Sequence, residues 1–176
     1  MTRLAIVGIS GRNHNPNIDH YNWMIDNVEI YIELILCQKP ENITLVSGGS
    51  SWADHVAISL FLTGKFKGLH LYLPTHFDCS GNKYINDYQG SMLNNLHTNF
   101  SKVIKINSLD QLSKVINNSN CITKIYKGFF QRNTTIAHNC DHLIAFSFND
   151  IPTGGTLDTW KKIKHNNKTN INLEWM

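Results

Sequence analysis

The stretch FFQRNTTIAHNCDHLIAFSFNDIPTGGTLDTWKK, Phe129 to Lys162, decides the fold. Its middle, Leu143 to Phe148, is an apolar run with one small polar residue. Such a run is too short for a helix and is typical of a strand that is covered on both faces, so we expect a central parallel strand. A helical segment that closes near Cys140 precedes it, and the pattern after it predicts a helix from Leu157 to Lys164.

The turn between this strand and the last helix carries Thr153, Gly154, Gly155 and Thr156. Glycines at such a turn leave space for a ligand beside the backbone. The helix behind them offers free N–H groups and the positive end of its dipole. The turn therefore favours an anion, above all a phosphate.

Arg132 and Asn133 open the helical segment before the strand, which places them at the mouth of the same crevice. An arginine can hold a phosphate or a carboxylate with two parallel hydrogen bonds, and an asparagine can bind a base or a sugar hydroxyl. Both side chains are therefore candidate ligand contacts.

The first strand, Leu4 to Ile9, runs into a turn that contains Gly8, Ser10, Gly11 and Arg12. Open α/β sheets hold phosphates and sugars at the carboxyl ends of their strands, so these residues are candidate ligand contacts. An ordinary strand-to-loop turn is the alternative interpretation.

A second strand, Ile43 to Val46, leads into another glycine turn and a helix of Ala53 to Leu62. The candidate ligand contacts in this turn are Ser47, Gly48, Gly49 and Ser50. Successive backbone N–H groups at such a bend form a cradle for anions. Asp54, in the first turn of the helix, either contacts the ligand or stabilises the helix dipole.

The remaining pattern predicts a helix from a cap at Asp19 to about Cys37, with an apolar stripe that includes Ile35, and a third strand from Gly68 to Leu73. The resulting β-α-β-α-β order predicts a parallel sheet with right-handed crossovers. Between residues 77 and 128 the pattern becomes irregular and predicts two short helices. An insertion of this length between core strands suggests a lid or a dimer surface. Ile171 to Trp175 is expected to be a closing edge strand.

The composition fits one folded domain over residues 1–176, with 41% hydrophobic residues and a formal net charge of +3. The lysines are scattered, so a nucleic-acid partner is not expected. Neither a signal peptide nor a membrane span is evident, and we expect a cytoplasmic protein. The four cysteines lack CxxC spacing, and His138 and His142 do not share a helix face, so neither a metal nor another cofactor is expected.

Two separated motifs carry a family resemblance. RN, IA, LIAF and GGT follow one another between Arg132 and Thr156, and VSGGSSWADHVA spans Val46 to Ala57. The chain resembles the SLOG superfamily, which includes the Lonely-guy phosphoribohydrolases and DprA proteins, over most of its length. The resemblance implies a Rossmann-like three-layer α/β fold, a nucleotide-like ligand and a homodimer. It also implies that Val46 to Ala57 contains a nucleotide-binding loop.

The resemblance also raises the question of catalysis. Lonely-guy enzymes split a nucleotide from its base with an arginine, matched by Arg132, and a glutamate, whose position is occupied by Thr159. A threonine cannot serve as a carboxylate base, and Asp158 is displaced by about 100° around the helix. We therefore expect nucleotide binding, with a nucleotide N-glycosidase that uses Arg132 and Asp158 or Asp54 as the alternative. A DprA-like DNA-associated protein is a weaker alternative.

Overall fold

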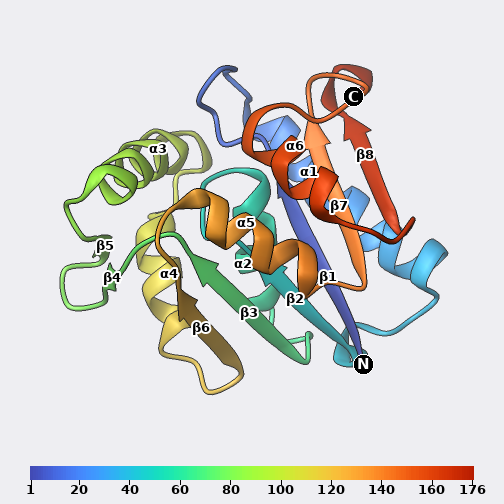
Figure 1. Ribbon diagram of the computed structural model, residues 1–176, viewed down its shortest axis with the longest axis horizontal. Coiled ribbons are helices and arrows are strands. Elements are labelled where there is room, and N and C mark those ends of the chain that lie inside the picture. Colours follow the sequence, from blue (N-terminus) through green and yellow to red (C-terminus); the bar gives the residue numbers. More distant parts are fainter.

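The computed structural model describes residues 1–176 as an α/β domain around a six-stranded parallel sheet (Figure 1). The order of the strands is β6-β3-β2-β1-β7-β8. Their bounds are β1 Thr2–Gly8, β2 Ile43–Ser47, β3 Gly68–Leu73, β6 Cys121–Ile125, β7 His142–Ser147 and β8 Lys168–Asn172. The predicted Rossmann-like three-layer fold with a central parallel sheet is confirmed.

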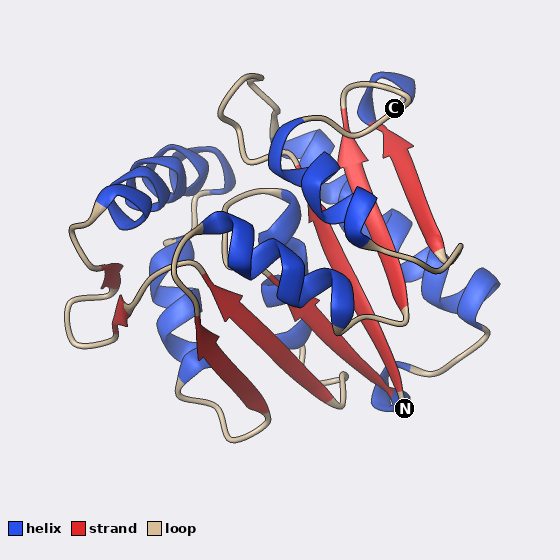
Figure 2. Cartoon of the chain, in the orientation of Figure 1, coloured by secondary structure: helices blue, strands red, loops and turns tan.

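Helices cover both faces of the sheet. In Figures 1 and 2, α5 and α6 lie in front of the sheet, while α1, α2 and α4 lie behind it. The helices are α1 Ile18–Tyr31, α2 Ala53–Phe61, α3 Tyr88–Ile104, α4 Ser108–Ile116, α5 Phe129–His138 and α6 Gly154–Lys162. Short elements are the π-helix Ile32–Leu36, the 3-10 helices Pro40–Asn42 and Leu173–Trp175, and the β4–β5 hairpin of Phe77–Asp78 and Lys83–Tyr84. None of the helices is both long enough and apolar enough to cross a membrane.

The two faces of the sheet bury two separate cores. Along β1, Leu4 and Ile6 belong to the larger core, which also contains apolar residues of α1, α2 and α4. Ala5 and Val7 point the other way into a smaller core that includes Ile136 of α5. This alternation arises because successive side chains of a strand point to opposite faces.

The chain order creates a switch point beside β1. From β1 the chain proceeds outward through β2, β3 and β6, and after α5 it returns to place β7 on the other side of β1. Loops that leave the carboxyl ends of β1 and β7 therefore diverge and leave a crevice. Gly8 closes this junction, because a β-carbon there would overlap the carbonyl oxygen of Phe146.

Several predicted boundaries were wrong at helix starts. The last helix, α6, begins at Gly154 instead of Leu157, because Thr153 is its extended N-cap residue. The first helix is capped by Asn17 instead of Asp19: the Asn17 side chain accepts the His20 N–H at 3.1 Å. Its last turns form the π-helix, which leaves Ile35 63% exposed instead of in the predicted apolar stripe.

The segment from residue 77 to residue 128 is more regular than the sequence predicts. It contains the β4–β5 hairpin, the 17-residue helix α3, helix α4 and the strand β6, which pairs with β3. Strand β6 was missed because it is a partly exposed edge strand of mixed composition. The other edge strand, β8, ends at Asn172, and a 3-10 turn occupies most of the predicted strand from Ile171 to Trp175.

Candidate functional site

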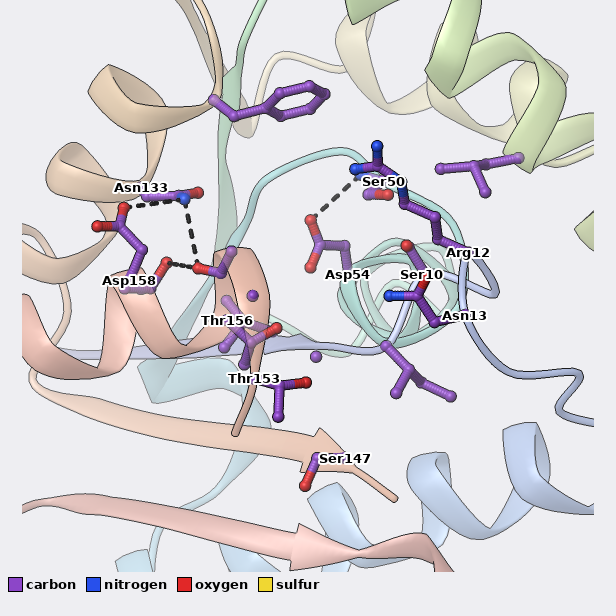
Figure 3. A pocket seen from close by; sticks show the side chains of 18 of the residues that line it. Ser10, Arg12, Asn13, Ser50, Asp54, Asn133, Ser147, Thr153, Thr156 and Asp158 are labelled. Carbon is purple, nitrogen blue, oxygen red and sulfur yellow. Dashed lines mark hydrogen bonds between the residues drawn. The ribbon is translucent and has the colours of Figure 1, made fainter. Parts of the chain in front are cut away.

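A cavity of about 470 Å³ lies at the switch point, over the carboxyl ends of β1 and β7 (Figure 3). Cavities of this size are typical of small-molecule sites. Thirteen of the residues that the sequence singled out line it: Gly8, Ser10, Gly11, Arg12, Ser50, Asp54, Arg132, Asn133, Thr153, Gly154, Gly155, Thr156 and Asp158. The structure thus brings together turns that are distant along the chain.

The N-terminus of α6 forms one side of the cavity. Thr153 is the N-cap residue but makes no capping hydrogen bond, and the first hydrogen bond of the helix is from Leu157 N to Thr153 O. The N–H groups of Gly154, Gly155 and Thr156 consequently have no acceptor within the chain. Three unpaired donors at the positive end of a helix dipole form a cradle for an anion.

The loop after β1 forms the opposite side, where Figure 3 shows Ser10, Arg12 and Asn13. The Ser51 hydroxyl donates to the Ser10 carbonyl at 2.7 Å and fixes the loop, while the guanidinium of Arg12 is exposed. Gly11 has φ +81 and leaves no space for a β-carbon, which would lie 2.6 Å from Trp52 Nε1. The loop is held by its backbone and keeps its polar side chains available.

Arg132, from the second turn of α5, is the buried cation of the site, with an exposed fraction of 7%. Its Nη1 donates to the Gly48 carbonyl and lies 3.3 Å from Asp54 Oδ2. Its Nε has no hydrogen-bond partner. Such an unpaired buried donor is rare in folded proteins.

Asp54 is the anionic partner of Arg132 and is equally buried. Desolvation raises the pKa of Asp54, and the attraction of Arg132 and a hydrogen bond from the Ser50 N–H oppose this rise. The ion pair therefore neutralises the floor of the cavity, because neither charge is stable there alone. The Nη2 of Arg132 makes no hydrogen bond within the chain.

Asn133 links α5 to α6 across the cavity. Its Nδ2 donates to the Gly155 carbonyl at 3.3 Å and to Asp158 Oδ2 at 3.2 Å, as Figure 3 shows. Asp158 Oδ2 also accepts from Lys162 Nζ at 2.8 Å. Thr159 is buried, and its hydroxyl donates to the Gly155 carbonyl at 3.2 Å. Asp158 is thus a paired carboxylate at the edge of the cavity.

Three of the predicted ligand contacts, Ser47, Gly48 and Gly49, do not line the cavity. They are buried in contacts within the chain. Ser47 Oγ donates to the Asp54 carbonyl at 2.8 Å, and the Gly49 carbonyl accepts from Tyr84 Oη at 2.7 Å and from His97 Nε2 at 2.9 Å. These three residues therefore support the site from behind, while Ser50, the next residue of the same turn, lines the cavity.

The cavity also has an apolar side that the sequence interpretation missed. It consists of Met92, Leu93 and Leu96 of α3 together with Phe129 and Phe130 of α5. Met92 and Leu96 are four residues apart in the sequence, a spacing that predicts one helix face but not what that face covers. Ser147 and Phe148 at the end of β7 were missed as well, and Phe148 stacks on His14 with ring centroids 4.8 Å apart.

Comparison with known proteins adds a relative that matches nearly the whole chain. A protein of Acanthamoeba polyphaga mimivirus, "Uncharacterized protein R261", is 53% identical over 175 residues, or 97% of this chain and 96% of the viral protein. The chain belongs to the family of this mimivirus protein. No family model and no solved structure matches the chain.

The histidines outside the cavity do not form a competing centre. His138 is exposed at the end of α5, and His142 Nδ1 lies 3.1 Å from the Tyr31 hydroxyl. No group of three or more histidine, cysteine, aspartate or glutamate side chains is placed to hold a metal ion.

Proposed function

We propose that the protein binds a nucleotide or a nucleotide-derived small molecule in this cavity. The observation that carries the proposal is that residues of two helices that line one cavity, in α6 and α5, have hydrogen-bond donors without a partner in the chain. The free N–H groups of Gly154, Gly155 and Thr156 lie on α6, and the buried Nε of Arg132 lies on α5. A phosphate bears several strong acceptors and a negative charge, so it satisfies donors of this kind.

The surroundings of the donors support a ligand larger than a phosphate ion. The hydroxyl groups of Ser10 and Ser50 and the side chain of Asn13 line the same cavity. Such groups can bind ribose hydroxyls and base edges, which require both donors and acceptors. A space of about 470 Å³ also exceeds what a single anion needs. The resemblance to the SLOG superfamily points to the same class of ligand.

A nucleotide N-glycosidase is the second candidate, because the carboxylates of Asp54 and Asp158 both line the cavity. Their partners weigh against it. Asp54 is paired with Arg132, and Asp158 is paired with Lys162 and Asn133. A carboxylate that must accept a proton or stabilise a sugar cation needs an accessible oxygen near the reacting bond. We therefore rank binding without base release first.

A thermal-shift screen with mono-, di- and cyclic nucleotides tests the proposal. A ligand at a hundred times its Kd stabilises the folded state by about 2.7 kcal/mol, which raises Tm by about 5–10 °C in a domain of this size. Arg12→Ala should reduce the shift, because Arg12 is an exposed cation of the cavity. Lys65→Ala, which removes an exposed cation away from the cavity, should leave it unchanged. The proposal fails if no nucleotide changes Tm.

Chromatography of the same mixtures separates binding from cleavage. We expect every nucleotide to be recovered intact after incubation with the protein. Release of free base that disappears in Asp158→Asn would reverse the ranking and establish the glycosidase, since that substitution keeps the shape of the side chain and removes its charge.

A further inference from the structure

The apolar side of the cavity has an arrangement that its polar side does not explain. Met92 and Leu96 are four residues apart on α3, so they lie on one helix face, and both remain partly exposed beside the cavity. Phe130 of α5 is 74% exposed and also lines the cavity. Large apolar side chains left at a cavity wall in this way indicate a surface for a ligand.

The apolar side of the cavity is held in a fixed position relative to the polar side. The ring of His97, one residue after Leu96, makes two hydrogen bonds that join α3 to its neighbours. Its Nε2 lies 2.9 Å from the Gly49 carbonyl and its Nδ1 lies 2.8 Å from Ser108 Oγ. Asp87 caps the start of α3 through the Gly90 N–H at 2.7 Å. Helix α3 therefore presents its face to the cavity without needing a ligand to order it.

We propose that Met92, Leu96 and Phe130 form a subsite for the base of the nucleotide, an inference that rests on the proposed function. A planar heteroaromatic ring can lie against apolar side chains and an aromatic ring with its faces and keep its polar edge free. Asn133 lies one turn after Phe129 and Phe130 on α5, and its carbonyl oxygen makes no hydrogen bond within the chain. This oxygen can accept from an amino group of a base or a hydroxyl of the sugar.

In this proposal the polar side of the cavity binds the phosphate of the ligand, and the apolar side binds its base. The free N–H groups at the start of α6 and Arg132 bind the phosphate whether or not the sugar carries a base. The apolar side adds to the affinity only when a base is present. Segment 77–128, which supplies Met92 and Leu96, would then determine selectivity for nucleotides over sugar phosphates.

Calorimetric titrations of AMP, GMP, CMP, UMP and ribose 5-phosphate test the subsite. Loss of contacts in an apolar pocket costs about tenfold or more in affinity, so Met92→Ala/Leu96→Ala and Phe130→Ala should each weaken the preferred nucleotide by at least that factor. Neither variant should change the binding of ribose 5-phosphate. Phe130→Tyr should retain the affinity for the nucleotide, since it keeps the ring.

Asn95→Ala is the matched control, because Asn95 is exposed on α3 beside Leu96 and does not line the cavity. Two outcomes overturn the subsite alone: ribose 5-phosphate binds the unaltered protein as tightly as every nucleotide, or the wall variants weaken both ligands equally or neither. If the unaltered protein binds none of the five ligands, the subsite fails, and if in addition no nucleotide of the thermal-shift screen changes Tm, the proposed function fails with it.

Discussion

The two glycine pairs of the chain, Gly48–Gly49 and Gly154–Gly155, look alike in sequence and differ in the folded protein. Each follows a strand of the parallel sheet and lies near the start of a helix. The first pair is buried, and its carbonyl groups are bound by Arg132, Tyr84 and His97. The second pair is exposed at the cavity, and its N–H groups have no acceptor. A glycine pair after a strand can therefore be buried as a support or remain exposed with free N–H groups.

The largest effect on stability is expected at the link between the supporting turn and the cavity. Arg132→Met would leave Asp54 buried without its partner, which typically costs about 3–5 kcal/mol. Urea denaturation monitored by tryptophan fluorescence would measure the loss. Arg132→Met combined with Asp54→Asn should recover most of it, since the buried charge is then removed as well. An equal loss in the single and double variants would contradict the role of the ion pair.

The next effect distinguishes the two glycine pairs directly. A β-carbon at Gly48 would overlap Arg132 Nη1 and lie 2.6 Å from Asp54 Oδ2, whereas at Gly155 the nearest atom is Asn133 Nδ2 at 3.7 Å. Gly48→Ala should therefore lower the free energy of unfolding by about 1–3 kcal/mol. Gly155→Ala should leave stability unchanged or raise it by up to about 1 kcal/mol, because alanine favours the helix. Similar losses from both changes would remove the distinction.

A smaller effect is expected in how the free energy of unfolding depends on pH, through the buried histidines near the supporting turn. Burial lowers the pKa of His97 to about 4 and of His55 to about 3. Both residues are neutral in the folded state at neutral pH, and the unfolded chain binds their protons first as pH falls below about 6.5. The contribution of the two histidines to stability is therefore present well above pH 6.5 and is lost as pH falls from about 6.5 toward their folded-state pKa values of about 4 and about 3, by at most about 1.4 kcal/mol per pH unit for each histidine.

Denaturation curves at several pH values check this expectation. The slope of stability against pH in that window should become shallower in His97→Gln, because one of the buried histidines is absent, while His55, His70 and His142, whose pKa values burial also lowers, keep part of the slope. A slope that does not change in His97→Gln would show that other groups bind the protons.

Sequence reasoning predicted the sheet well because buried parallel strands are continuous apolar runs. The strands at β2, β3 and β7 stand out in this way, and their order with the helices left one plausible architecture. The carboxyl-end rule then placed the turns after β1 and β7 at one crevice. These parts depend on local pattern and on topology, both of which a single sequence contains.

The parts that were missed depend on contacts between distant segments. Nothing local distinguishes Gly49 from Gly155; the difference arises because Tyr84 and His97, far along the chain, bind the Gly49 carbonyl. The apolar wall was missed for the same reason, since Met92 and Leu96 could equally have packed into the core. Strand β6 lacked an apolar run because an edge strand is partly exposed.

The most direct test of the account is the affinity of Gly155→Asp for the nucleotide that the unaltered protein binds best, with Gly155→Asn as a control of equal size. Aspartate is tolerated in the first turn of a helix, so both variants should fold with the stability of the unaltered protein. A carboxylate in the cradle should repel the phosphate and weaken binding by on the order of a hundredfold or more relative to Gly155→Asn. Equal affinities of the two variants would contradict an anion site at the start of α6.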